Sequence, residues 1–305
     1  MPTSLTVKLA DLILKNPTIL ASGILGTTCG LMKRIEKAGA GAITTKTVTE
    51  KPREGFFNPV FVDLGFGYLN AMGLPNPGAY YFKEEIMKAK DSLNIPIIAS
   101  IGGKDEKEFL KVAELMIEAN CDALELNLSC PHVREYGLDI GSDVSLSKRI
   151  TKEIKSISPR PVFVKISVSH AEREIVEKLL DSGIDGISAI NTIRAMVIDV
   201  EAMIPVLSNV FGGLSGPCIR PIAVRVVYEI HREFPDIPII GMGGIQDWRD
   251  ALEFIMAGAS AVGIGSAIAK KDLNIFKEIV EGIRAFLIRN NFNSIRDLIG
   301  CAHRR

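Results

Sequence analysis

The stretch IPIIGMGGIQDWRDALEFIMAGASAVGIGSAI, residues 237–268, contains one complete repeat of the fold that the sequence predicts. Two short apolar runs, IPIIGMGG from Ile237 and AVGIGSAI from Ala261, are typical of strands buried on both faces. An amphipathic helical pattern lies between them and ends near Gly258, a residue type that often caps a helix C-terminus. Two such strands joined by a helix predict a parallel βαβ unit.

The same alternation of strand and helix continues through most of the chain. Eight strands of this kind predict an α/β fold of the TIM (β/α)8 barrel class, which we expect to form a single domain over residues 1–305. A doubly wound open sheet is the alternative. It would need fewer strands and a glycine-rich turn after the first, which ASGILGTTCG only loosely resembles. The other six strand candidates are PTILASG from Pro17, GAITTKTV from Gly41, IPIIASIGG from Ile95, ALELNLSC from Ala123, PVFVKIS from Pro161 and GISAINT from Gly186.

Two connections are longer than the usual loop between a strand and a helix. They cover residues 49–78, after the second strand, and residues 193–220, after the sixth. Because both follow the carboxyl ends of strands, we expect both to be insertions that cover the catalytic face of the barrel.

The composition narrows the classes of partner. Lysine plus arginine and aspartate plus glutamate both number 36 in 305 residues, so the formal net charge is zero. This balance gives no reason to expect nucleic acid or an anionic membrane as the main partner. No apolar segment reaches the roughly 20 residues that cross a bilayer, and the N-terminus lacks a signal-peptide pattern. The five scattered cysteines form no CxxC pair, so we expect no bound metal and a reducing, cytoplasmic location.

The residues at the predicted strand ends carry the functional interpretation, because active sites of (β/α)8 barrels lie there. Turn glycines, helix-capping hydroxyls and solvated lysines are the ordinary explanation for any one of them. Two lysines and several amides on one rim are harder to explain in that way. The strand-end residues are Ser22, Lys46, Thr47, Ser100, Asn127, Cys130, Lys165, Asn191, Thr192, Gly243, Gly244, Gly265 and Ser266.

Three groups of these residues point to particular ligands. GMGG and GIGS end the last two strands, where backbone N–H groups and a helix N-terminus often bind phosphate. Lys46 and Lys165 could flank an electron-rich ring such as a flavin, although a Schiff-base lysine of an aldolase-like barrel is the alternative. Asn70, Asn127 and Asn191 would suit a planar substrate with alternating C=O and N–H groups, such as a pyrimidine. Asn70 could equally be an ordinary turn residue.

Cys130 has an unusual setting for a cysteine. A structural cysteine is normally buried among apolar side chains. Here Asn127, Ser129, Pro131 and His132 surround Cys130 at a strand end. A free thiol has a pKa of about 8.5, so a nearby cation would allow it to act as a general base near neutral pH.

Long motifs, in order from about Pro17 to Lys270, resemble the class 1 dihydroorotate dehydrogenases, most closely class 1B and its archaeal relatives. The motifs are TKTVTEKPREGFFNPV, LNAMGLPNPG, LELNLSCPHV, FVKIS, AINT, GGLSGPCIRPIAVRVVYEI and the stretch 237–267. The resemblance implies an FMN-binding barrel that oxidises dihydroorotate to orotate in pyrimidine biosynthesis. It further implies a homodimer core and an NAD-linked partner subunit that carries FAD and a [2Fe–2S] cluster.

The resemblance also assigns residues. Cys130 matches the catalytic base that removes a proton from C5 while the C6 hydride goes to flavin N5. Lys46, Asn70, Ala71, Met72, Gly73, Leu74, Asn127, Asn191 and Thr192 match substrate positions. Ser22, Lys46, Thr47, Ser100, Asn127, Lys165, Ile190, Gly216, Gly243, Gly244, Gly265 and Ser266 match cofactor positions.

Two related flavin enzymes with different reactions or electron acceptors remain as alternatives. NLSCPHV departs from the more common NISCPNV, and a similar SCPH occurs in the flavin domain of dihydropyrimidine dehydrogenase, which reduces uracil and thymine. Class 1A enzymes instead pass electrons to fumarate without a partner subunit. Class 2 enzymes use serine as the base, so the cysteine in this chain argues against that class.

Overall fold

The computed structural model describes residues 3–128 and 143–304. Its centre is a closed barrel of eight parallel strands, each joined by backbone hydrogen bonds to its neighbours. The barrel prediction is therefore confirmed, and the doubly wound alternative is wrong. In barrel order the strands are β3 (Thr18–Leu20), β4 (Ala42–Thr44), β7 (Ile97–Ile101), β8 (Ala123–Asn127), β9 (Val162–Ile166), β10 (Gly186–Ala189), β15 (Ile239–Met242) and β16 (Ala261–Ile264).

The sequence explains why these runs become strands. Every residue of the eight strands is buried, since helices cover the outer face and side chains from all strands fill the interior. The register of neighbouring strands places Asn127 beside Lys165, and Lys165 beside Ser188. Polar side chains on three adjacent strands are thereby brought to one level of the barrel.

Helices surround the barrel, with their apolar faces turned inward. In α3, Phe109, Val112, Ala113 and Met116 are buried at helical spacing, and the Asp105 carboxylate caps the N-terminus by accepting from the Glu108 N–H at 2.8 Å. The helices are α1 (Cys29–Lys37), α2 (Ala79–Lys90), α3 (Glu106–Glu118), α5 (Val144–Ile157), α6 (Arg173–Leu180), α7 (Arg220–Glu233), α8 (Trp248–Ala257), α9 (Ile268–Lys271) and α10 (Asn274–Arg289). Short 3-10 helices are η2 (Val168–His170), η3 (Pro217–Ile219), η4 (Ile295–Leu298) and η5 (Cys301–His303).

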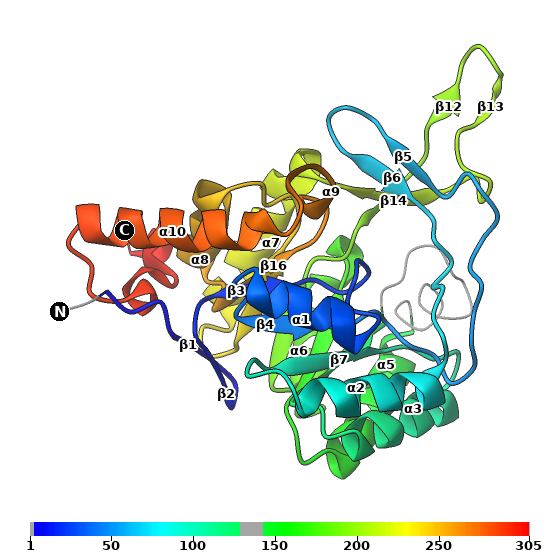
Figure 1. The fold of residues 1–305 in the computed structure, drawn as a ribbon, viewed down its shortest axis with the longest axis horizontal. Helices are drawn as coiled ribbons and strands as arrows, with labels where there is room; N and C mark the ends of the chain where they lie inside the picture. The colour runs from blue at the N-terminus through cyan, green and yellow to red at the C-terminus, as the bar shows by residue number, and fades with distance from the viewer. Residues whose placement is uncertain (1–2, 129–142, 305) are drawn as a thin grey trace.

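The two long connections form a separate antiparallel sheet on one side of the barrel, which we call the extension (Figure 1). Its strands are β5 (Phe61–Asp63), β6 (Tyr68–Asn70), β11 (Ile193–Ala195) and β14 (Gly212–Ser215), in the order β11-β14-β6-β5. A small hairpin of β12 (Ile198–Asp199) and β13 (Ile204–Pro205) projects beyond it. The sequence predicted the two insertions but not their strands, which are too short to show a clear alternating pattern.

A hairpin near the N-terminus was also not predicted. It consists of β1 (Val7–Leu9) and β2 (Leu12–Leu14), joined at Ala10, which has a positive φ of 51°. Leu9 and Leu14 are fully buried and belong to the main hydrophobic core. Each strand has only three residues, so its pattern alone could not be distinguished from an irregular segment.

Candidate functional site

The strand ends of the barrel and the extension enclose one cavity of about 330 Å³. Residues from the barrel strands form its floor and walls, and Asn70 and the segment after it border it from the extension. Most of the predicted site residues line this cavity. They are Ser22, Lys46, Thr47, Asn70, Met72, Gly73, Leu74, Asn127, Lys165, Ile190, Asn191, Thr192, Gly216, Gly243, Gly244, Gly265 and Ser266.

Two predicted residues in the described part of the chain, Ser100 and Ala71, do not line the cavity. Ser100 is fully buried behind Thr47, with its hydroxyl oxygen 2.9 Å from that of Thr47. Ala71 is fully buried in a small apolar cluster with Leu69 and Leu207. Cys130 lies outside the described residues, so its role as a base stays a prediction.

Thr47 is the centre of a polar network beside the cavity. Its Oγ1 lies 3.1 Å from Ser22 Oγ and 2.9 Å from Ser100 Oγ, and it accepts a hydrogen bond of 3.2 Å from the Asn127 side-chain amide. Asn127 Oδ1 in turn accepts from the Asn191 amide at 3.4 Å. These residues lie in or just after five different strands, and the network fixes the orientation of the two asparagines at the cavity wall.

Two lysines approach the cavity from opposite parts of the barrel. Lys46 follows β4 and Lys165 lies in β9, and both are less than a tenth exposed. The Lys46 ammonium donates to the backbone carbonyl of Gly23 at 3.4 Å. Two positively charged groups at the cavity wall attract electron density, so the cavity suits a ligand with an electron-rich or negatively charged ring.

One buried carboxylate lies in the same barrel interior and was not noticed in the sequence. Glu125 lies two residues before Asn127 in β8, so both side chains project from the same face of the strand. It is fully buried, and its Oε2 accepts from the Ser188 hydroxyl at 2.7 Å. Within the described residues its Oε1 has no partner. The only available signal was a single acid in the apolar run ALELN.

Glycine turns form the part of the cavity that suits a phosphate. Gly243 and Gly244, after β15, have φ values of 131° and 83°, which disfavour other residue types. Across the described residues, the backbone N–H groups of Gly243, Gly244, Gly265 and Ser266 donate to no protein acceptor. N–H groups at adjacent turns can bind an anion, so this wall fits the phosphate of a nucleotide cofactor.

Several lining residues were missed by the sequence reasoning. Phe61, in β5, reaches the cavity from the extension and is half exposed. Ile24, Ser215 and Ile219 also line the cavity. The hairpin around Gly65 could have drawn attention to Phe61, because PVFVD before it has the composition of a strand.

Two further observations concern metals and membranes. In residues 3–128 and 143–304, no group of three or more His, Cys, Asp or Glu side chains is arranged to hold a metal ion. None of the helices in those ranges is long and apolar enough to cross a bilayer.

Comparison with known proteins connects this cavity to one family. The family model described as dihydroorotate dehydrogenase matches residues 4–287. The chain belongs to the dihydroorotate dehydrogenase family. The family resemblance seen in the sequence is therefore confirmed.

Curated members of the dihydroorotate dehydrogenase family from archaea match over nearly the whole chain. A protein from Methanocaldococcus jannaschii is 47% identical, covering 95% of both chains. One from Pyrococcus furiosus is 45% identical, covering 99% of both, and one from Methanosarcina acetivorans is 45% identical, covering 97% of this chain and 95% of the other. Each of the three relatives is named dihydroorotate dehydrogenase B (NAD(+)), catalytic subunit.

Proposed function

We propose that the protein oxidises (S)-dihydroorotate to orotate in pyrimidine biosynthesis, with FMN as its resident cofactor. One observation carries the proposal: a single cavity gathers most of the residues that the family resemblance assigns to substrate and flavin. The family match supports the reaction, and the lysines and glycine turns support a flavin with a phosphate.

The residues of the cavity fit FMN in two separate regions. Gly243, Gly244, Gly265 and Ser266 would hold the phosphate through their backbone N–H groups. Lys165, Lys46 and Thr47 would border the ring system. When bound, FMN would supply the acceptor for the hydride that leaves C6 of the substrate.

The remaining residues would bind the substrate and remove its proton. Asn127 and Asn191 are held by the network centred on Thr47, so their amides can bind the C=O and N–H groups of a pyrimidine ring without reorganising. Asn70 would approach from the extension. We assign to the Cys130 thiolate the removal of the C5 proton, which together with loss of the C6 hydride forms the ring double bond of orotate.

The electron acceptor and the assembly belong to the same proposal. The curated relatives are named as catalytic subunits of an NAD(+) enzyme. We infer that a separate subunit with FAD and a [2Fe–2S] cluster accepts the electrons and passes them to NAD. A homodimer core, a single-domain organisation over residues 1–305 and a cytoplasmic location remain predictions.

An anaerobic absorption spectrum before and after addition of dihydroorotate tests the function. We expect a flavin band that bleaches with dihydroorotate and stays oxidised with dihydrouracil. Bleaching by dihydrouracil alone would favour the pyrimidine reductase alternative. A protein without a flavin band even after FMN is added would contradict the proposal and favour a Schiff-base barrel. Reoxidation by fumarate without a partner would favour the class 1A alternative.

A further inference from the structure

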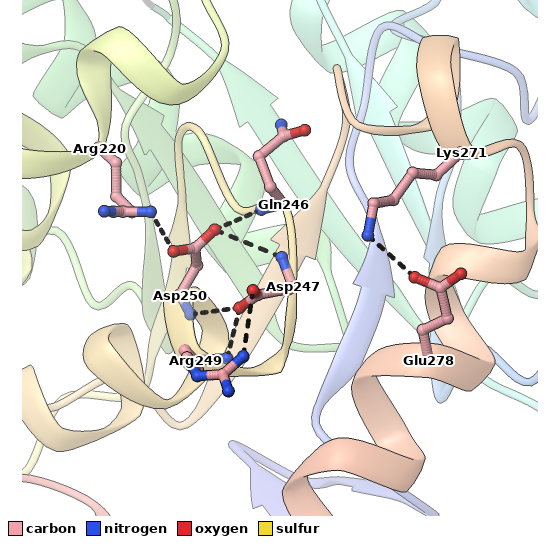
Figure 2. A network of polar contacts seen from close by, with 7 residues as sticks. All are labelled: Arg220, Gln246, Asp247, Arg249, Asp250, Lys271 and Glu278. Carbon is pink, nitrogen blue, oxygen red and sulfur yellow. Dashed lines mark hydrogen bonds and ion pairs between the residues drawn. The ribbon is translucent and has the colours of Figure 1, made fainter.

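A buried carboxylate connects two segments that border the cavity. Asp250, in the first turn of α8, is 8% exposed. Its Oδ2 accepts from the backbone N–H of Gln246 at 2.7 Å and of Asp247 at 3.3 Å, and its Oδ1 pairs with the Arg220 guanidinium (Figure 2). Because Arg220 begins α7, this one side chain ties the loop after β15 to the start of α7.

The loop that Asp250 holds contains the glycine turn of the cavity wall. A Cβ on Gly244 would lie 2.5 Å from the Gly216 carbonyl oxygen and 3.0 Å from Arg220 Cβ. The Gly243–Gly244 turn is therefore packed directly on the segment that leads into α7. Its position depends on the separation between that segment and the loop, which the Arg220–Asp250 pair fixes.

We propose that Asp250, paired with Arg220, is a positioning residue for a phosphate-binding turn at Gly243–Gly244. The inference rests on the proposed function, because its ligand is the 5′-phosphate of FMN. Asp250 uses its charge to hold the N–H groups of Gln246 and Asp247 in the loop that contains the glycine turn. Among the described residues, the N–H groups of Gly243 and Gly244 donate to no protein acceptor, so they are available to the phosphate.

Arg220 provides the charge balance that such a carboxylate requires. An isolated aspartate beside a phosphate dianion would repel it. The guanidinium offsets that charge at Asp250. Its Nε also contacts Glu253 at 3.0 Å, but Glu253 is half exposed, so water screens its charge.

The test compares FMN with riboflavin, which has the same ring and ribityl chain but no phosphate. Full-length protein with Asp250→Asn is titrated with each flavin, and the quenching of flavin fluorescence gives the two dissociation constants. We expect the Kd for FMN to rise about tenfold, because the amide is a poorer acceptor for the loop N–H groups and a poorer partner for Arg220. The Kd for riboflavin should not change, whereas a general loss of structure would weaken both flavins.

Two further variants make the result decisive. Glu278→Gln is the matched control, since it removes the exposed Lys271–Glu278 ion pair of 3.0 Å drawn in the same view, and should leave both constants unchanged (Figure 2). Arg220→Gln keeps Asp250 and its backbone hydrogen bonds but removes the compensating cation. Arg220→Gln should also raise the Kd for FMN without changing that for riboflavin. If Asp250→Asn does not fold, this variant tests the inference in its place.

Equal weakening of both flavins, or an unchanged Kd for FMN in a folded variant, would overturn the inference. The inference would also be overturned if the unchanged protein bound riboflavin as tightly as FMN, because the phosphate would then contribute nothing to binding. An unchanged protein that binds neither flavin would instead contradict the proposed function.

Discussion

The role of a single residue in this protein depends on the side chains that it contacts in the fold. Thr47 is an ordinary strand-end hydroxyl in the sequence, but in the fold its oxygen contacts three side chains that lie in or just after three other strands. The sequence identified Thr47, Lys46 and Lys165 because strand ends of a barrel converge. It did not identify Glu125, because an acid within an apolar run carries no local signal of what lies opposite.

Cys130 is the residue on which the proposed chemistry depends. We expect Cys130→Ser to retain FMN but to slow flavin reduction by dihydroorotate at least about 10²-fold near neutral pH, because a serine hydroxyl, unlike a thiol, scarcely ionises to its basic anion at that pH. Stopped-flow absorption under anaerobic conditions measures the rate. An unchanged rate would remove Cys130 from the mechanism.

Cys121→Ser is a suitable control for that experiment. Burial raises the pKa of the Cys121 thiol to about 12, so this thiol is protonated and unreactive at neutral pH. The control should reduce its flavin at the normal rate. A comparable loss of rate in the control would indicate that cysteine replacement disturbs the fold.

At the level of elements, the sequence predicted the barrel strands and the helix end near Gly258. Gly39, Gly183 and Gly258 follow helices at positive φ, as expected for residues that end a helix. The strands of the extension could not be predicted, because β6 is paired with β14 from a segment more than a hundred residues away and each has only a few residues.

Two glycine substitutions, one just after a helix and one within a helix, should have opposite effects on stability. A Cβ on Gly258, which ends α8 at a φ of 123°, would lie 2.2 Å from the His231 ring. We expect Gly258→Ala to lower the free energy of unfolding by about 2 kcal/mol or more through backbone strain and overpacking. Gly30→Ala in α1 should raise it by about 0.5 kcal/mol, since helix propensity improves and its Cβ meets nothing within 4 Å. Urea unfolding followed by circular dichroism measures both, and a similar loss in the two variants would contradict the prediction.

At the level of the whole molecule, a cluster near the C-terminus links stability to pH. The ring of His303 in η5 stacks on Tyr228 at 3.8 Å and lies 5.0 Å from that of His231. Burial lowers the pKa of His231, and His303 lowers it further, while Asp236 acts in the opposite direction. Below the ordinary histidine pKa, the unfolded chain therefore binds more protons than the folded protein at this site.

The folded protein should consequently lose stability as the pH falls below about 6.5 toward the depressed pKa of His231. We expect the urea midpoint to fall between about pH 7.5 and about pH 5.5, and to fall less in His231→Gln. An equal fall in both proteins would show that other groups control the pH dependence.

The predicted homodimer can be tested on the extension. Phe57, Val200 and Met203 are more than three-quarters exposed there, and a surface with several exposed large apolar side chains is a candidate interface. Light scattering should give a dimer for the unchanged protein and a monomer for Val200→Glu combined with Met203→Glu. Ile288→Glu on α10, at the opposite side of the molecule in Figure 1, should remain dimeric. A monomeric unchanged protein would contradict the dimer.

The sequence by itself determined the barrel, the two insertions and most of the cavity residues. Apolar runs alternating with amphipathic helices are local patterns, and a closed parallel barrel brings all strand ends to one rim. Only the tertiary structure decided which distant groups meet: β6 with β14, Thr47 with Asn127, and Arg220 with Asp250. Such contacts depend on how the closed barrel orients each loop, and no local pattern of residues encodes that orientation.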